Sequence, residues 1–342
     1  MYLCRLYATD TIRSDMKDTT KNIGILSGLV LLLAVLFLSD LCFGSIHISL
    51  SELLGKTDGV DRQILLDLRL PRAITAVIAG AALSVSGLMM QTLFRNPLAG
   101  PYILGVSSGA TLGVGILVLC GSLIGFAAGN MLTVVAAIIG ATAVLLLVLA
   151  ISYRIESQVS LLIIGMMFGS IAGALVNVMQ NFANPDALKL FIVWSLGSLS
   201  SVTWGEMPFL LPLFAVGLLM ALLLIKPLNG LLLGENYARG LGIHVQQLRF
   251  LLVLSTGLLA GGVTAFCGPI AFVGVAVPHL ARGLFRTSNH RITMPACCLI
   301  GADLLLLCDL LANQFTYPLP ISTLSALAGA PIIIWIICKK RI

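Results

Sequence analysis

The side chains that could carry catalysis or bind a metal are few in this chain, and their spacing does not form a site. The four histidines are too far apart to give metal-ligand spacing: His47, His244, His279 and His290. Most of the eight cysteines fall in or beside apolar stretches, and no Cys-x-x-Cys pair occurs, so we expect them to pack as small apolar residues. The sequence predicts no metal site.

Two short motifs imitate catalytic or nucleotide-binding sequences. Gly55-Lys56-Thr57 copies the end of a phosphate-binding loop, but Leu50 stands where that motif needs its first glycine. The segment Gly105–Gly109 matches Gly-x-Ser-x-Gly, which requires a strand-to-helix turn and a triad partner, whereas here it opens an apolar helix. Neither motif supports an enzyme, and a membrane-embedded hydrolase is disfavoured for the same reason.

The composition shows which elements must position the remaining polar residues. The 342 residues are 58% hydrophobic and only 10% charged, whereas about a quarter of the residues of a soluble domain are charged. The net charge of +6 comes from basic residues in short segments between apolar runs, which is a pattern of membrane orientation rather than of nucleic-acid binding. The sequence therefore predicts an all-α polytopic membrane protein.

Apolar stretches long enough to cross a bilayer predict about ten transmembrane helices after a polar N-terminal tail, residues 1–22. The transmembrane domain would then cover residues 23–342. Residues 187–200 are apolar but short, and we expect them to form an extra helix at the membrane surface or partway into it. The predicted crossings lie near 23–43, 73–94, two within 96–153, then 158–182, 206–226, 246–267, 270–286, 292–312 and 321–338.

The basic residues predict the orientation of these crossings. With ten crossings, fifteen of the 20 lysines and arginines fall on the side of the two termini, so both termini are expected in the cytoplasm. Acidic residues within the crossings are scarce, and Asp40, Asp303 and Asp309 are the ones that stand out. Asp303 has no basic partner nearby in sequence, so the chain is poorly equipped for ion coupling, although an ion-coupled secondary transporter stays open as the alternative.

Two polar loops on the cytoplasmic side are suited to contacts. Residues 95–101 hold two prolines, which forbid a regular helix and stiffen the turn; a rigid hairpin between helices is the plainer interpretation. Residues 228–247 can form a short surface helix near Glu235–Arg239, and three successive leucines precede it. A solvated loop would not need those leucines, so we expect this segment to dock a soluble partner.

Several segments together resemble the FecCD family, the permease subunits of type II ABC importers for iron-siderophores, haem and cobalamin. The resemblance covers nearly everything after residue 64. It is specific because the segments occur in the family's order and spacing: Arg69-Leu-Pro-Arg72, Arg95-Asn-Pro-Leu-Ala99, Leu233 to Gly242, Gly268 to Gly274, Pro278-His279 and Gly329-Ala-Pro331.

The resemblance implies a bacterial inner-membrane permease of ten helices with inverted repeats and a pathway on the two-fold axis of a homodimer or close heterodimer. The chain would catalyse nothing and bind no cofactor, because two cytoplasmic ATPase subunits would hold ATP and Mg. An external substrate-binding protein would deliver the chelate. ATP-driven closure of the ATPase pair would push the coupling loops and switch access across the membrane.

The same resemblance assigns roles to residues. Arg69 and Arg72 would dock the binding protein, although snorkelling interfacial arginines would look the same. Asn96 and Leu98 would lie at the cytoplasmic gate. The ATPase contact would fall on Gly234, Glu235, Ala238, Arg239, Gly240, Leu241 and Gly242. The family often has an arginine where Asn313 stands here, so a third docking arginine is missing.

Overall fold

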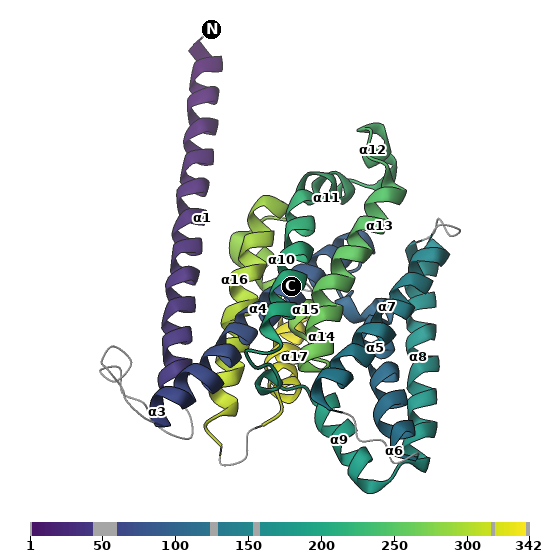
Figure 1. Cartoon of the computed structure of the whole chain (residues 1–342). Helices are drawn as coiled ribbons and strands as arrows, with labels where there is room; N and C mark the ends of the chain where they lie inside the picture. Colours follow the sequence, from purple (N-terminus) through teal and green to yellow (C-terminus); the bar gives the residue numbers. More distant parts are fainter. Residues whose placement is uncertain (1, 44–59, 124–128, 153–157, 316–318, 340–342) are drawn as a thin grey trace.

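The computed structural model describes residues 2–43, 60–123, 129–152, 158–315 and 319–339. All regular secondary structure in these ranges is helical, which confirms the predicted all-α class. The N-terminal half contains α1 (Tyr2–Cys42), α3 (Val60–Gln63), a π-helical stretch (Ile64–Arg69) that continues into α4 (Leu70–Leu93), α5 (Val106–Gly115), α6 (Gly121–Leu123), α7 (Asn130–Ser152) and α8 (Gln158–Phe182) (Figure 1).

The C-terminal half begins with α9 (Pro185–Ser195), which overlaps the short helix expected at 187–200 but begins two residues earlier and ends at Ser195. Its first turn forms because Asn184 caps it, accepting a hydrogen bond from the Ala187 amide at 2.8 Å, and because Pro185 suits the first helical position. The helices that follow are α10 (Met207–Leu223), α11 (Ile225–Leu232), α12 (Glu235–Gly240), α13 (Val245–Thr256), α14 (Gly262–Cys267), α15 (Val273–Phe285), α16 (His290–Ala312) and α17 (Ile321–Lys339).

The helix lengths agree with most of the predicted crossings. Among the described residues, seven helices are long and apolar enough to cross a membrane, and α10 with α11 makes an eighth candidate that is bent by 51°. The shorter apolar helices α15 and α17 occupy the positions of two further predicted crossings. The total of ten crossings stays a prediction, whereas the polytopic helical architecture is confirmed.

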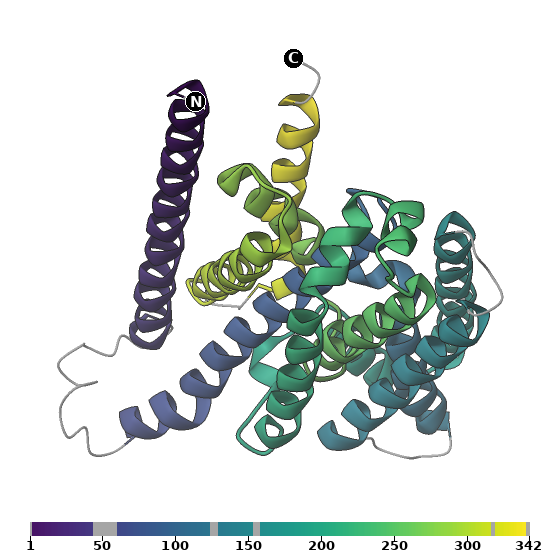
Figure 2. The same ribbon diagram turned by 90° about the horizontal axis from the view of Figure 1, so that it is seen from above.

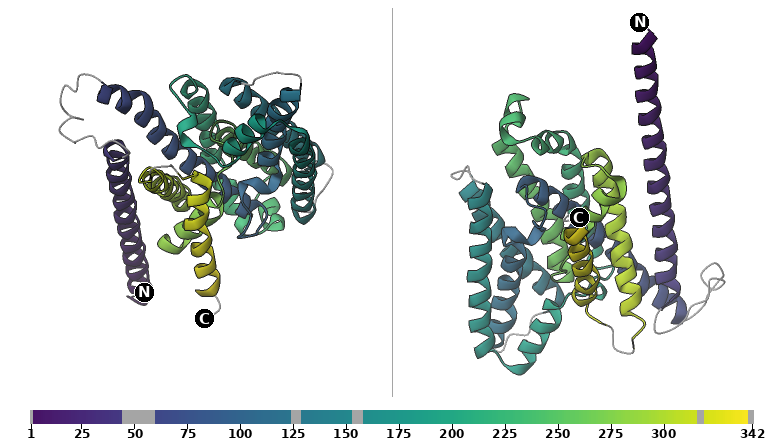
Figure 3. Two further views of the ribbon diagram at one scale, coloured as in Figure 1. Left: turned by 90° about the horizontal axis from the view of Figure 1, so that it is seen from below. Right: turned by 180° about the vertical axis from the view of Figure 1, so that it is seen from behind.

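The first helix differs in extent from the expected tail and span. Its apolar part, Thr20–Cys42, matches the predicted first crossing, but the helix begins at Tyr2, so the segment predicted as a polar tail continues the same helix. α1 lies at one edge of the molecule and α8 at the opposite edge (Figures 1 and 3).

α4 forms the centre of the bundle and crosses it obliquely (Figure 2). In its most apolar stretch 89% of the residues are buried, against 22% for α8 at the edge. α4 approaches α16 closely because Gly80 faces Gly301, and a β-carbon on either glycine would collide with the other's backbone. Small residues permit such close packing where no hydrophobic force drives helices together in lipid.

The bundle has two distinct ends along α16. At one end, the N-terminus of α16 contacts α11, and α12 projects beyond its neighbours α11 and α13 (Figure 1); we call this the α12 end. At the other, the C-terminal part of α16 meets the start of α4 and the end of α1; we call this the Arg72 end. The predicted site residues divide between these two ends.

Candidate functional site

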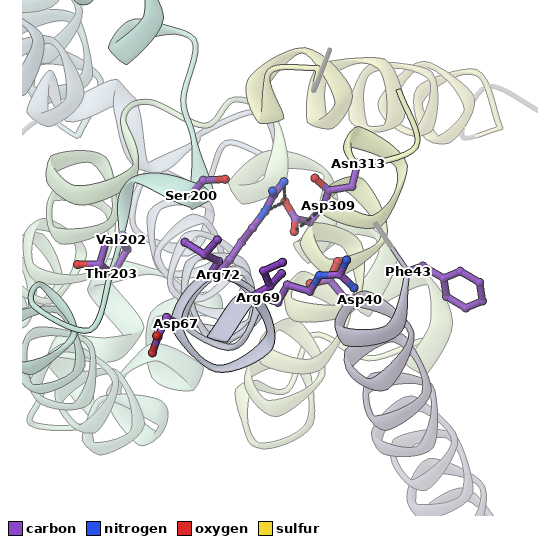
Figure 4. A pocket seen from close by; sticks show the side chains of 12 residues that line it. Asp40, Phe43, Asp67, Arg69, Arg72, Ser200, Val202, Thr203, Asp309 and Asn313 are labelled. Carbon is purple, nitrogen blue, oxygen red and sulfur yellow. Dashed lines mark hydrogen bonds and ion pairs between the residues drawn. The ribbon is translucent and has the colours of Figure 1, made fainter. Parts of the chain in front are cut away.

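At the Arg72 end, the side chain of Arg72 is held by a buried acid. Arg72 Nη2 lies 2.6 Å and Nε 2.9 Å from Asp309 Oδ1 (Figure 4). The Asp309 side chain is fully buried and that of Arg72 is 18% exposed. Asn313 donates a longer hydrogen bond of 3.4 Å to the other carboxylate oxygen. Charge-assisted bonds of this kind are strong, and they fix the start of α4 against the end of α16.

Arg69 makes a different contact one helical turn earlier. Its guanidinium donates to the backbone carbonyls of Leu41 at 2.7 Å and Cys42 at 3.1 Å. These are among the last carbonyls of α1, which have no partner within the helix and carry partial negative charge. Arg69 therefore caps α1 and ties its end to the start of α4.

A cavity of about 250 Å³ opens beside these two arginines. Asp40 lines it from α1, and Ser200 and Thr203 line it from the segment between α9 and α10 (Figure 4). That segment is held by Glu206, whose carboxylate accepts hydrogen bonds from the amide of Thr203 at 2.9 Å and from its hydroxyl. Burial alone would raise the pKa of Glu206, but these bonds to the charged form lower it below its ordinary value.

At the α12 end, the short helix α12 is fixed at its start. Gly234 has φ +119°, a backbone conformation that favours glycine, and the Arg95 guanidinium lies against it, 2.8 Å from where a β-carbon would be. Glu235 then pairs with Arg249 of α13 at 3.0 Å, and the Arg249 side chain is only 5% exposed. Ala238 faces inward and is buried. α12 is thus anchored to the bundle by charge and by packing.

The loop after α4 lies beside α12. Arg95, with φ +48°, points its guanidinium at the Leu231 carbonyl at 3.4 Å. Asn96 accepts a hydrogen bond from the Leu98 amide at 2.9 Å, which closes a tight turn and leaves the Leu98 side chain 52% exposed. His279 of α15 bonds to the Pro97 carbonyl at 2.7 Å. The loop therefore connects the α11–α12 corner to α15.

A buried polar network joins α11 to α4 and α16 at the same end. The His290 ring contacts Thr92 Oγ1 at 2.9 Å and Asn229 Oδ1 at 2.8 Å. Asn229 also accepts from the His290 amide and donates to Asn289, which caps α16. Buried networks in which every member is bonded hold elements in one arrangement. We expect α11, α4 and α16 to move as a unit at this end.

The chain is similar to known proteins both in sequence and in fold. The FecCD transport family matches residues 31–339. The chain belongs to the FecCD transport family. The FecCD permease described here is 36% identical over 93% of its length to the hemin transport system permease protein HmuU of Yersinia pestis, covering 96% of that protein. It is 37% identical over 92% of its length to the vitamin B12 import system permease protein BtuC of Klebsiella pneumoniae, covering 94% of it.

The fold of the FecCD permease also matches a solved structure. That structure shows an inward-facing conformation of an ABC transporter of the metal-chelate type, with a TM-score of 0.84 and 32% identity over 92% of this chain and 99% of the other. The chain is therefore a multi-span transport permease with the ABC permease fold, and the ion-coupled carrier is not favoured.

The structure separates the predicted site residues of the FecCD permease into two groups. Arg69 and Arg72 lie together at the Arg72 end, whereas Asn96, Leu98 and residues 234–242 lie together at the α12 end. Arg249 and Asn229 were not predicted as site residues, because Glu235 is 14 residues from Arg249 and His290 is 61 residues from Asn229 and no local motif links them. The available signal for Arg249 was a charged residue within the largely apolar helix α13. Lys56 lies outside the described residues.

Proposed function

We propose that this permease is the membrane subunit of an ATP-driven importer that carries a chelate of the iron-siderophore, haem or cobalamin type into the cytoplasm. The α12 end faces the cytoplasm and binds two ATPase subunits, which hold ATP and Mg. The Arg72 end faces outward and receives a substrate-binding protein. Two copies of the chain form a homodimer around the pathway, and both termini are cytoplasmic.

One observation carries this proposal: three exposed apolar residues, which we call the stripe, lie on α12 and directly before and after it. Leu233 precedes the helix, Tyr237 lies in it and Leu241 follows it, and these residues are 65%, 54% and 58% exposed. α12 projects beyond its neighbours α11 and α13 (Figure 1), so this stripe is not covered by those helices. Exposed apolar residues on an anchored surface helix mark a protein contact. The relatives' ABC assignment makes an ATPase the partner that fits.

The contacts behind α12 give the proposed coupling a mechanical route. A push on the stripe is transmitted to α13 through Glu235 and Arg249, and to the loop after α4 through Arg95. That loop holds the proposed gate residues Asn96 and Leu98. Gly234 to Gly242 are therefore the ATPase contact in this proposal, and the loop is the first element of the pathway to respond.

At the Arg72 end, the proposed docking role of the arginines must accommodate their internal bonds. Arg72 is partly exposed but shares its guanidinium with Asp309, and Arg69 caps α1. An acidic side chain of a binding protein would compete with Asp309 for Arg72. Docking at this end would thereby loosen the junction between α4, α16 and α1, which is a way to signal an arriving cargo across the membrane.

The test is the double substitution Tyr237→Ser with Leu241→Ser in the complex reconstituted with its ATPase. We expect assembly of the ATPase on the permease to weaken by about tenfold or more, because truncating a central apolar contact costs at least about 1.4 kcal/mol. Co-purification and stimulated ATP hydrolysis measure it. The control is Asn236→Ala, an exposed polar position on the same helix. Unchanged assembly in the double variant contradicts the proposal.

A further inference from the structure

A second, larger cavity opens at the α12 end. Its volume is about 860 Å³, within the range of about 300–1,000 Å³ typical of small-molecule sites. The residues that define its chemistry come from four elements: α4, the loop after it, α15 and α17. They are Gln91, Arg95, Pro97, His279, Arg282 and Trp335.

The charge of this cavity has one sign. Two guanidiniums, those of Arg95 and Arg282, line it, and no Asp or Glu is among its described lining residues. Arg72 pairs with Asp309 and Arg249 with Glu235, and neither pair involves Arg95 or Arg282. Arg95 and Arg282 therefore have no described carboxylate within 4 Å. No carboxylate of the described residues therefore compensates their positive charge.

Neutral groups nevertheless hold both arginines in place. Arg282 donates to the side-chain oxygen of Gln91, and Gln91 in turn donates to the Val275 carbonyl at 3.1 Å, which aims its oxygen at the guanidinium. Arg95 is placed by its left-handed backbone and by the glycine at position 234. Arg282 is partly buried on the apolar helix α15, and a cation there is costly unless something offsets its charge; Arg95 is exposed in the loop after α4. Among the described residues both guanidiniums meet neutral acceptors and no carboxylate, which leaves their charge for an anionic ligand.

We infer that this cavity binds a carboxylate- or phosphate-bearing ligand, and that the ligand is the anionic part of the cargo as it leaves the pathway. The inference rests on the proposed import function and narrows its cargo to a chelate with free acidic groups. A guanidinium suits carboxylate and phosphate because it can donate two parallel hydrogen bonds. The loop that carries Arg95 also carries the proposed gate residues, so the site lies where release occurs.

An anionic lipid headgroup has the same chemistry and is the other source of such a ligand. Basic pockets between helices on the cytoplasmic side bind acidic headgroups. The shape favours the cargo, since the cavity includes the loop after α4 and not only the outer faces of helices. The experiment separates the two sources.

The probe is haemin, a metal chelate with two carboxylates, compared with its dimethyl ester, in which both are blocked. The full chain is placed in phosphatidylcholine nanodiscs, and quenching of Trp335 fluorescence reports binding, with Trp335→Phe as the signal control. We expect the ester to bind about tenfold more weakly than haemin. Arg282→Gln and Arg95→Gln should each weaken haemin to the level of the ester without changing ester binding, while Arg282→Lys keeps most of the affinity.

Unchanged ester binding shows that the variants are folded, so the comparison stands on charge alone. Equal affinity for haemin and ester in the parent chain, or no loss in Arg282→Gln, overturns the inference. If phosphatidylglycerol in the nanodisc abolishes the advantage of haemin, the site belongs to lipid and the cargo assignment is overturned. A complex that imports a chelate but binds both probes equally refutes this inference while leaving the proposed function standing.

Discussion

Arginines lie at both ends of the helix bundle, but their surroundings differ. At the Arg72 end, Arg72 is paired with Asp309, an acid whose side chain is fully buried. At the α12 end, Arg282 and Arg95 contact only neutral oxygens among the described residues. The same side chain therefore serves two purposes. A guanidinium paired with a buried carboxylate holds helices together, whereas one held by amide and carbonyl oxygens keeps its charge available to an incoming anion.

Arg249 shows that an arginine's pairing with an acid does not depend only on the end of the bundle at which it lies. It lies at the α12 end, but it is paired with Glu235 and is 5% exposed, so it belongs with Arg72 as a structural cation. The contrast is therefore between paired and uncompensated arginines. Substitutions that remove one carboxylate at a time test it, because only paired arginines should lose stability when their acid is neutralised.

The largest effect is expected for Asp309→Asn, which leaves Arg72 without its acid. Removing one partner of a buried pair costs about 3 kcal/mol or more because the remaining charge is uncompensated. The thermal midpoint of the detergent-purified chain should fall by several degrees. Adding Arg72→Gln should recover part of the loss, since the two effects belong to one interaction.

Asp303→Asn is the matched control on the same helix. Asp303 is buried, but neither of its carboxylate oxygens has a hydrogen-bond partner among the described residues. Neutralising it should leave stability unchanged or raise it, because a lone buried charge is unfavourable. If both variants lose equal stability, the Arg72–Asp309 pair has no special role and the contrast between paired and uncompensated arginines fails.

A smaller loss is expected for Arg249→Met, which removes the anchor of α12 but keeps its apolar stem. A hydrogen bond to a charged group contributes about 2 kcal/mol, and here the loss should be local. Amide hydrogen exchange at residues 235–240 should become faster, and ATP hydrolysis coupled to cargo should fall. Arg239→Met, an exposed arginine on α12, is the control for exchange; equally fast exchange in that control would contradict the anchoring role.

Hydropathy located the helices well because the bilayer dictates their length. The predicted crossing at 292–312 corresponds to α16, which runs from His290 to Ala312. The predicted second crossing began at residue 73, but the helical path begins at Val60, because a π-helical stretch runs through Asp67 and Arg69. The predicted crossing began too late because it was placed after the charged residues. Arg69 remains in the helix because the carbonyls at the end of α1 accept its hydrogen bonds.

Partners within the site could not be predicted from one sequence. Arg72 and Asp309 are 237 residues apart, and no local spacing links them. Asp303 and Asp309 look alike in sequence, six residues apart on one helix, but only Asp309 meets an arginine. Local signals did better: the short helix expected near Glu235–Arg239 is α12, and the short apolar segment at 187–200 overlaps α9. Tertiary pairing depends on how helices cross, which periodicity does not encode.

The smallest effect is expected for Glu206→Gln, because its acid is held by neutral donors rather than by an arginine. Losing the charge-assisted bonds from Thr203 should cost about 1 kcal/mol at pH 7. The pKa of Glu206 is lowered in the folded chain, so its contribution is complete above the ordinary value of 4.5 and is lost as pH falls through the lowered value. The thermal midpoints of the parent and the variant should converge as the pH falls through the lowered pKa of Glu206. Asp67→Asn, an exposed acid lining the same cavity, is the control, and a Glu206→Gln difference that persists unchanged at low pH would show that the carboxylate is not what stabilises this segment.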